Sequence, residues 1–267
     1  MGINPDIMAP EGWQAALAAL DWQAEMGVAD WVLDDPVDRY GLPERLERPV
    51  QEGLPARGAV AKAPDAPKAD PVATATHAAQ NAQTLEGLRA ALTAFDHCEL
   101  KRGARSTVFA DGNPKARVLI LGEAPDREED QEGLPFVGRA GHLLDRMFEA
   151  IGLSRQSPDP ATALYLTTAF PWRPPQNREP EPAEIAMLRP FVERHIALID
   201  PDVIVVMGNT PCLVLLNQKA MLRLRGTWTT ALGKPVLPMT HPAYLLRTPA
   251  AKREAWADLL SLKARLT

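Results

Sequence analysis

Apolar and polar positions along the chain separate short buried strands from amphipathic helices. Four apolar runs of strand length lie within ARVLILGEAP, ALYLTTAFPW, PDVIVVMGN and KPVLPMTHP. Helical spacing of apolar residues is found in RAGHLLDRMFEAIGL, PEPAEIAMLRPFVERHIALIDP and AAKREAWADLLSLKARL. Strands that alternate with helices form parallel sheets covered on both faces. The pattern therefore predicts a three-layer α/β/α fold with a mostly parallel central sheet.

Composition divides the chain into three parts. Apolar residues at roughly helical spacing predict an N-terminal helical segment within 1–52. The stretch 53–83 is rich in Ala and Pro, with few large apolar residues, and predicts a semi-flexible linker. Thr84 is a good N-cap for the helical pattern that follows it, so the compact domain is predicted over 84–267.

Charge and cysteine content limit the classes of function. The 267 residues carry a formal charge of −5, but residues 1–88 hold 14 acidic and 6 basic residues, whereas 89–267 hold 20 acidic and 23 basic ones. The second part is mildly basic, which permits nucleic-acid binding without requiring it. Two cysteines exclude a disulfide framework, and neither a secretory signal nor an apolar run of membrane-spanning length is found. A reduced, cytoplasmic setting is expected.

Three unusual peptides follow the predicted strands: GEAPD, PWRPPQNR and THPAYLLR. In parallel sheets, sites collect in the loops beyond the carboxyl ends of the strands. These three loops are therefore expected to meet at one edge of the sheet.

The first loop combines carboxylates with an aromatic residue. Five carboxylates occur within eight positions, namely Glu123, Asp126, Glu128, Glu129 and Asp130. A solvated acidic turn and a catalytic cluster explain them equally well. Phe136 follows in a Pro- and Gly-rich stretch, where an aromatic ring serves either as a stacking platform for a base or as a buried loop anchor.

The third loop contains His241 directly before a proline, which holds the histidine backbone extended and fixes the direction of the side chain. A hydrogen-bonded histidine within the fold is the alternative to a functional one. Leu245 or Leu246 is a candidate wedge for a DNA stack, with Arg247 beside it as a phosphate clamp.

Taken together, the peptides GEAPDREEDQEGLPFVGRAGHLLDRM, RPPQNREPEPAEI, DPDVIVVMG and HPAYLLR resemble, in order and spacing, the motifs of family-four uracil-DNA glycosylases. The resemblance covers about residues 89–265. It implies an enzyme that flips a nucleotide out of DNA and hydrolyses the N-glycosidic bond of uracil or another deaminated base, which initiates base excision repair. Damaged DNA is the expected partner, and a monomer is expected.

The resemblance also implies roles for individual residues. Glu123, Ala124, Asp126 and His241 are the expected catalytic set, in which Glu123 and Ala124 occupy the water-activating motif and His241 donates to uracil O2. The expected base-binding set is Gly122, Phe136, Thr168, Glu129 and Asp130, with the two acids supporting the loop. The expected DNA-binding set is Arg139, Arg173, Arg178, Leu245, Leu246 and Arg247.

The chain departs from the family at the positions of an iron–sulfur cluster. Family-four enzymes hold the cluster on four cysteines, and here Cys98 alone matches clearly. Phe95, Trp172 and Leu188 stand at the other three positions. One thiolate cannot hold a cluster. We therefore expect no metal and no cofactor, and an apolar plug in the vacated volume.

Two further departures concern the chemistry. Thr168 stands where the family has an asparagine that reads the uracil edge, which widens the range of plausible deaminated bases. Asp126 stands where the family has glycine, and either activates water or repels the phosphates.

A non-catalytic or weakly catalytic damaged-DNA binding protein on the same fold is the alternative function. A related group traps uracil-DNA covalently through a histidine in an Arg-rich insert. This chain has only Gln176, Asn177, Arg178 and Glu179 at that place, which argues against trapping.

Overall fold

The computed structural model describes residues 17, 18, 22, 70–219 and 221–267. The chain divides into two units, residues 1–64 and residues 65–267. The predicted N-terminal helical segment lies outside the described residues, apart from positions 17, 18 and 22, which are helical.

The second unit is built on a six-stranded sheet with the strand order β1-β3-β2-β4-β6-β5. Its strands are β1 (Ala110–Gly112), β2 (Val118–Gly122), β3 (Leu164–Thr168), β4 (Val203–Met207), β5 (Thr229–Ala231) and β6 (Lys234–Met239). The four inner strands are parallel, and the two edge strands pair antiparallel. The four predicted strands are the parallel ones. The three-residue edge strands β1 and β5 were not predicted.

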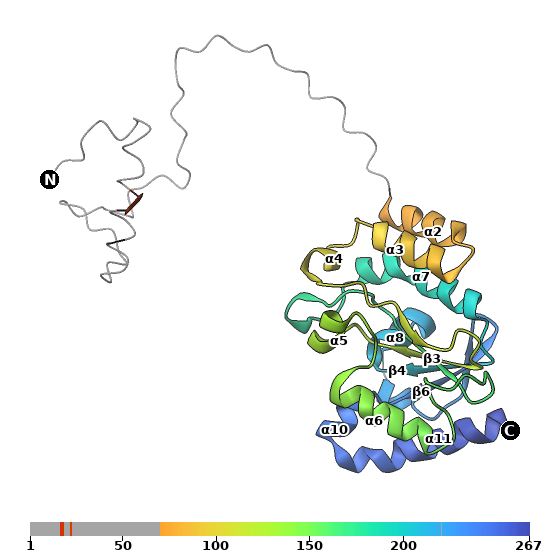
Figure 1. Cartoon of the computed structure of the whole chain (residues 1–267). Helices are drawn as coiled ribbons and strands as arrows, with labels where there is room; N and C mark the ends of the chain where they lie inside the picture. Colours follow the sequence, from red (N-terminus) through yellow and green to blue (C-terminus); the bar gives the residue numbers. More distant parts are fainter. Residues whose placement is uncertain (1–16, 19–21, 23–69, 220) are drawn as a thin grey trace, which may run out of the picture. The chain divides into compact units, whose positions relative to one another are not determined.

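Helices cover both faces of this sheet, as Figure 1 shows. Successive β2 residues enter different apolar clusters, because Leu119 and Leu121 face one side and Val118 and Ile120 face the other. The first side is covered by α2 (Pro71–Asn81), α3 (Leu85–Ala94), α7 (Pro182–Ile199) and α8 (Asn209–Leu216), and the second by α6 (Gly138–Glu149) and α11 (Lys252–Leu266). The predicted three-layer fold is confirmed.

Short helices complete the unit: α4 (Leu100–Gly103), α5 (Arg127–Glu132), η2 (Pro175–Asn177), α9 (Met221–Leu224), α10 (Pro242–Arg247) and η3 (Pro249–Ala251). Of these, α5 and α10 lie in segments that were predicted to be loops. In residues 70–219 and 221–267, no helix has both the length and the apolar character needed to cross a bilayer.

The prediction of a linker over 53–83 is wrong for its last part, because residues 71–81 form α2. Asp70 caps this helix through a hydrogen bond from the Val72 N–H at 2.9 Å. Ala75 and Ala79 are buried, and α2 packs against α7. Alanine is the best helix former and lets two helices approach closely, so the composition that suggested a linker serves helix packing instead. The predicted N-cap at Thr84 is confirmed, since its hydroxyl accepts from the Gly87 N–H at 3.1 Å.

Candidate active site

A cavity of about 490 Å³ opens beyond the carboxyl ends of β2, β3 and β6. Nine of the predicted site residues line it: Glu123, Ala124, Asp126, Glu129, Phe136, Thr168, Arg178, His241 and Arg247. The first, second and third predicted loops therefore meet in one place, as the position of sites in parallel sheets leads one to expect.

His241 is the N-cap residue of α10. Its Nδ1 accepts a hydrogen bond from the Ala243 N–H at 3.2 Å, which requires Nδ1 to be unprotonated. Burial lowers the pKa of His241 below its ordinary value, against the opposing charges of Glu123 and Asp126. The imidazole is therefore neutral near pH 7 with its proton on Nε2, and this N–H is available as a donor.

Phe136 lies beside His241 at the cavity wall. The two ring centroids are 5.7 Å apart and the ring planes differ by 23°. Phe136 is only 3% exposed, so its ring is a buried anchor as well as part of the wall. A Cβ on Gly122 would lie 2.5 Å from the Phe136 ring. Gly122 thus takes part by making room for the ring, and it does not line the cavity itself.

Glu129 holds the loop that carries Phe136. Its carboxylate accepts from the Asp126 N–H at 2.8 Å and from the Phe136 N–H at 2.5 Å. Burial raises the pKa of Glu129 to about 7, against the lowering effect of these backbone hydrogen bonds. Two backbone donors fix the carboxylate, so Glu129 supports the loop as predicted from the resemblance.

Glu123 connects two strand ends. Its Oε1 accepts from the Asn209 N–H at 2.9 Å, at the start of α8. Gly208 has φ 107, and a Cβ there would lie 2.3 Å from Glu123 Oε1, so glycine is required at this close approach. Oε2 accepts no hydrogen bond from the described residues. One oxygen of Glu123 is thus anchored, and the other is free to hold a water or a substrate atom.

Thr168 and Asp126, the two positions that depart from the family pattern, both make hydrogen bonds to nearby backbone groups. The Thr168 hydroxyl donates to the Phe170 carbonyl at 2.7 Å, which leaves its lone pairs for a base. Asp126 is the N-cap of α5 and accepts from the Glu129 N–H at 2.9 Å. Asp126 and Glu129 form a reciprocal capping box, which explains why the acidic run is a helix.

Several predicted DNA- and base-binding residues need correction. Leu245 is fully buried on the inner face of α10, so it cannot serve as a wedge, whereas Leu246 is partly exposed. The two terminal guanidinium nitrogens of Arg178, Nη1 and Nη2, donate to Glu184 at 2.8 and 2.6 Å, so this arginine is not a free phosphate clamp. Asp130 is buried outside the cavity wall.

The role of Asp130 is structural, because its Oδ1 accepts from the backbone N–H groups of Arg105 and Ser106 at 2.9 and 3.1 Å. Arg139 is exposed and Arg173 is partly exposed, and neither lines the cavity. Arg173 donates to the Asn177 side chain at 2.9 Å. Arg247 is exposed and lines the cavity.

The positions that correspond to iron–sulfur ligands do not fit a cluster. Phe95, Cys98, Trp172 and Leu188 are all buried in one apolar core cluster. Burial raises the pKa of the Cys98 thiol, which disfavours the thiolate that a metal needs. Within 70–219 and 221–267, no group of three or more His, Cys, Asp or Glu side chains could hold a metal ion.

Sequence reasoning missed Asn209, Gly208 and Arg155. The apolar pattern of PDVIVVMGN predicts only a strand, but the structure starts α8 directly after it, with Gly208 as the N-cap and Asn209 as the first helical residue. Arg155 has no local signal, because its partners lie between 10 and 44 residues away.

Comparison with known proteins agrees with the geometry. The family model described as "Uracil DNA glycosylase superfamily" matches residues 109–260. A Type-4 uracil-DNA glycosylase of Thermotoga maritima is 38% identical over 153 residues, which cover 56% of this chain and 77% of the relative. A Type-4 uracil-DNA glycosylase of Saccharolobus solfataricus is 35% identical over 180 residues, 64% of this chain and 81% of the relative. A DNA polymerase of Bacillus phage SP01 is 33% identical over 138 residues, 52% of this chain and 14% of the relative.

Proposed function

The chain belongs to the uracil-DNA glycosylase superfamily, and from this premise we propose that it hydrolyses the N-glycosidic bond of uracil, and of other deaminated bases, in DNA. The observation that supports the proposal most directly is that Phe136, His241 and Glu123 meet at one cavity. A flipped nucleotide needs a stacking surface, a donor to the departing base and a held water, and these residues supply them.

His241 stabilises the leaving base. When the bond between the sugar C1′ and the base nitrogen breaks, its electron pair goes to the base and negative charge develops at O2. The Nε2–H of the neutral imidazole donates to that oxygen, because Nδ1 is occupied by the Ala243 N–H. A fixed donor acts mainly on the charge of the transition state, and therefore contributes to rate more than to binding.

The water that attacks C1′ is held by the segment Glu123–Asp126. Glu123 contributes the oxygen that is not anchored to α8, Ala124 contributes its backbone, and Asp126 takes the proton as the C1′–O bond forms. The conjugate anion of the base is later protonated by solvent, and Asp126 releases its proton to solvent, which restores the starting state. No step involves an iron–sulfur cluster, since the residues at its positions do not fit one.

The base lies against Phe136 with its polar edge near Thr168. Stacking of one base on an aromatic ring is worth roughly 1–3 kcal/mol and tolerates different bases. Thr168 offers only lone pairs once its proton is donated to Phe170, so it accepts from a base N–H without demanding the full uracil pattern. This supports a substrate range that includes hypoxanthine or xanthine.

DNA is held by Arg247 at the cavity and by Arg139, Arg173 and Leu246 outside it, which leaves Leu245 and Arg178 out of the predicted DNA-binding set. The protein acts as a monomer in the cytoplasm, where the buried thiols of Cys98 and Cys212 remain reduced.

The test is incubation with oligonucleotides that contain a single uracil, hypoxanthine or xanthine, followed by alkali and separation of the cleaved strand. Alkali-labile product from the uracil strand, absent from a matched thymine strand, is the expected result. A stable complex with damaged DNA and no product would support the alternative, a non-catalytic damage-binding protein.

A further inference from the structure

The backbone at Phe136 is in a conformation that side chains rarely adopt. Its φ is 53, in the left-handed region. A non-glycine residue in this region is strained, so the surrounding structure must hold it there. A Cβ on Gly141 would lie 1.8 Å from the Phe136 carbonyl oxygen, so helix α6 also packs directly on this peptide.

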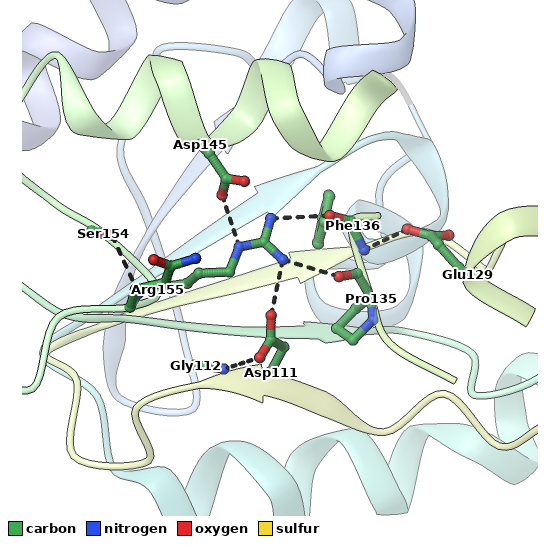
Figure 2. A network of polar contacts seen from close by, with 9 residues as sticks. Asp111, Gly112, Glu129, Pro135, Phe136, Asp145, Ser154 and Arg155 are labelled. Carbon is green, nitrogen blue, oxygen red and sulfur yellow. Dashed lines mark hydrogen bonds and ion pairs between the residues drawn. The ribbon is translucent and has the colours of Figure 1, made fainter. Parts of the chain in front are cut away.

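Both polar groups of the Phe136 residue are held by charged side chains. Figure 2 shows Glu129 on one side, where it accepts the Phe136 N–H at 2.5 Å. On the other side, Arg155 donates to the Phe136 carbonyl at 3.0 Å and to the Pro135 carbonyl at 3.3 Å. Two consecutive carbonyls bound by one planar guanidinium leave the loop little freedom to rotate.

Arg155 is itself fixed from two elements. Asp111 in β1 pairs with its Nη1 at 3.0 Å, and Asp145 in α6 pairs with its Nε at 2.8 Å. The Arg155 side chain is only 11% exposed. The guanidinium of Arg155 thus donates to four partners, as the network in Figure 2 shows. A shorter side chain cannot make all four contacts.

We propose that Arg155 is a positioning residue for base capture: it holds the Phe136 peptide in its left-handed conformation and thereby places the ring at the cavity wall. That the ring captures a base rests on the proposed function. That Arg155 fixes the Phe136 loop rests on the contacts alone. Arg155 does not line the cavity, so it acts through Phe136 and not through contact with DNA.

A purely structural role for Arg155 makes a different prediction, and a second buried arginine provides the matched control. The Arg225 side chain is 19% exposed and pairs with the buried Asp258 at 2.5 Å and with Glu254 at 3.3 Å, but it does not line the cavity, and its hydrogen bonds go to Asp258 and Glu254 and not to Phe136. Arg225→Gln therefore removes an equivalent buried ion pair without touching the loop. Any effect that follows from lost stability alone appears in both variants.

The first experiment is independent of catalysis. Amide hydrogen exchange of the peptide that spans residues 133–137 is measured in the wild type, Arg155→Gln and Arg225→Gln. We expect faster exchange in this peptide for Arg155→Gln only, since the Phe136 N–H loses its fixed geometry. Equal exchange in all three proteins overturns the proposal, whatever the enzyme does to DNA.

The second experiment is a double-mutant cycle on capture of uracil-DNA by single-turnover kinetics. In the wild-type background, Arg155→Gln is expected to weaken capture by about tenfold, an effect no larger than the loss of one stacked base. In the Phe136→Ala background, the same substitution is expected to change capture by less than about twofold. Arg225→Gln is expected to leave capture unchanged in both backgrounds.

Additive effects of Arg155→Gln and Phe136→Ala overturn the proposal. If Arg155→Gln does not fold, Asp145→Asn replaces it in both experiments. This variant removes one support of the guanidinium and leaves its contacts to the two carbonyls possible. Exchange and capture are then expected to change in the same direction as for Arg155→Gln, but by less. Should no variant show any glycosylase activity, including the wild type, the proposed function fails while the exchange result still decides the role of Arg155.

Discussion

At the scale of single residues, His241 combines a half-buried imidazole with an acceptor role at Nδ1. His241→Ala is expected to lower the single-turnover rate by roughly 100-fold, because a preorganised donor to a developing anion acts in the transition state. The dissociation constant for uracil-DNA, measured separately, should change little. Weaker binding with an unchanged chemical rate would contradict the assigned role.

Asp126 caps α5 and lines the cavity, and the proposed mechanism gives it a second, separable role as a charge beside the reacting sugar. Asp126→Asn keeps a good cap and removes the charge, whereas Asp126→Gly also weakens the capping box. We expect Asn to retain the melting temperature but to lower the rate by roughly tenfold or more, the scale of a lost general base. DNA affinity at fixed ionic strength should be equal or tighter, since a negative charge near phosphates is removed.

A faster rate for Asp126→Asn would show that Asp126 restrains the reaction. Water activation would then be assigned to Glu123 and the Ala124 backbone. The alternative function, a damaged-DNA binding protein with weak or no catalysis, would then be favoured over a glycosylase.

At the scale of elements, the loop between β2 and α6 has a built-in dependence on pH through Glu129. Burial raises the pKa of Glu129 to about 7 from its ordinary 4.5, so the folded state holds more protons than the unfolded chain between these values. The contribution of this group to stability is therefore present below about pH 4.5 and is lost as pH rises through about 7.

Glu129→Gln is expected to make the decline in the free energy of unfolding between pH 5 and pH 7 shallower. Urea unfolding at a series of pH values measures this slope. Glu132→Gln, an exposed carboxylate at the end of the same helix, is the control for loss of a surface charge. An unchanged slope in Glu129→Gln would show that another group carries the dependence.

The apolar plug makes a further prediction about elements. Trp172 is buried among the residues that replace the cluster ligands, and its indole N–H donates to Thr107 at 3.1 Å. Trp172→Ala should cost about 3–5 kcal/mol of stability, as for other large core truncations. The purified wild-type protein should be colourless. Stoichiometric iron with visible absorption would contradict the plug.

The pattern of the sequence predicted the elements that are long or continuous in apolar character. The strands β2, β3, β4 and β6 are buried runs, and α6, α7 and α11 are periodic, so each is visible in one window. The helix α2 was missed because its buried side chains are alanines, which are too small to form a visible stripe of large apolar residues. The helix α10 was missed because a helix of six residues that begins at a proline is too short to show helical periodicity.

For the site, the predictable part was the set of residues within contiguous motifs. Glu123, Phe136 and His241 lie in peptides that parallel strands bring to one edge. The pairing of Arg178 with Glu184 depends on how the η2 turn places the arginine against the start of α7, and the burial of Leu245 depends on tertiary packing, so neither follows from apolar periodicity. Arg155 is the clearest case, since its four contacts come from three separate segments.

At the scale of the whole molecule, charge is distributed unevenly between the two units. Residues 1–64 hold 11 acidic and 5 basic residues, and residues 65–267 hold 23 acidic and 24 basic ones. The unit that carries the cavity is thus close to neutral and slightly basic, while the first unit is acidic. A tethered acidic segment repels phosphates at ranges set by salt, roughly 8 Å at physiological ionic strength.

A chain that begins at Asp65 is therefore expected to bind DNA more tightly than the full chain at low salt, with the difference shrinking as salt rises. The dissociation constant is measured for both chains across a salt series by fluorescence anisotropy with one labelled duplex. A full-length variant with the acidic residues of 1–64 changed to Asn and Gln keeps the length and should bind like the shorter chain. Weaker binding by the shorter chain at every salt concentration would mean that residues 1–64 contribute contacts to DNA that outweigh their charge.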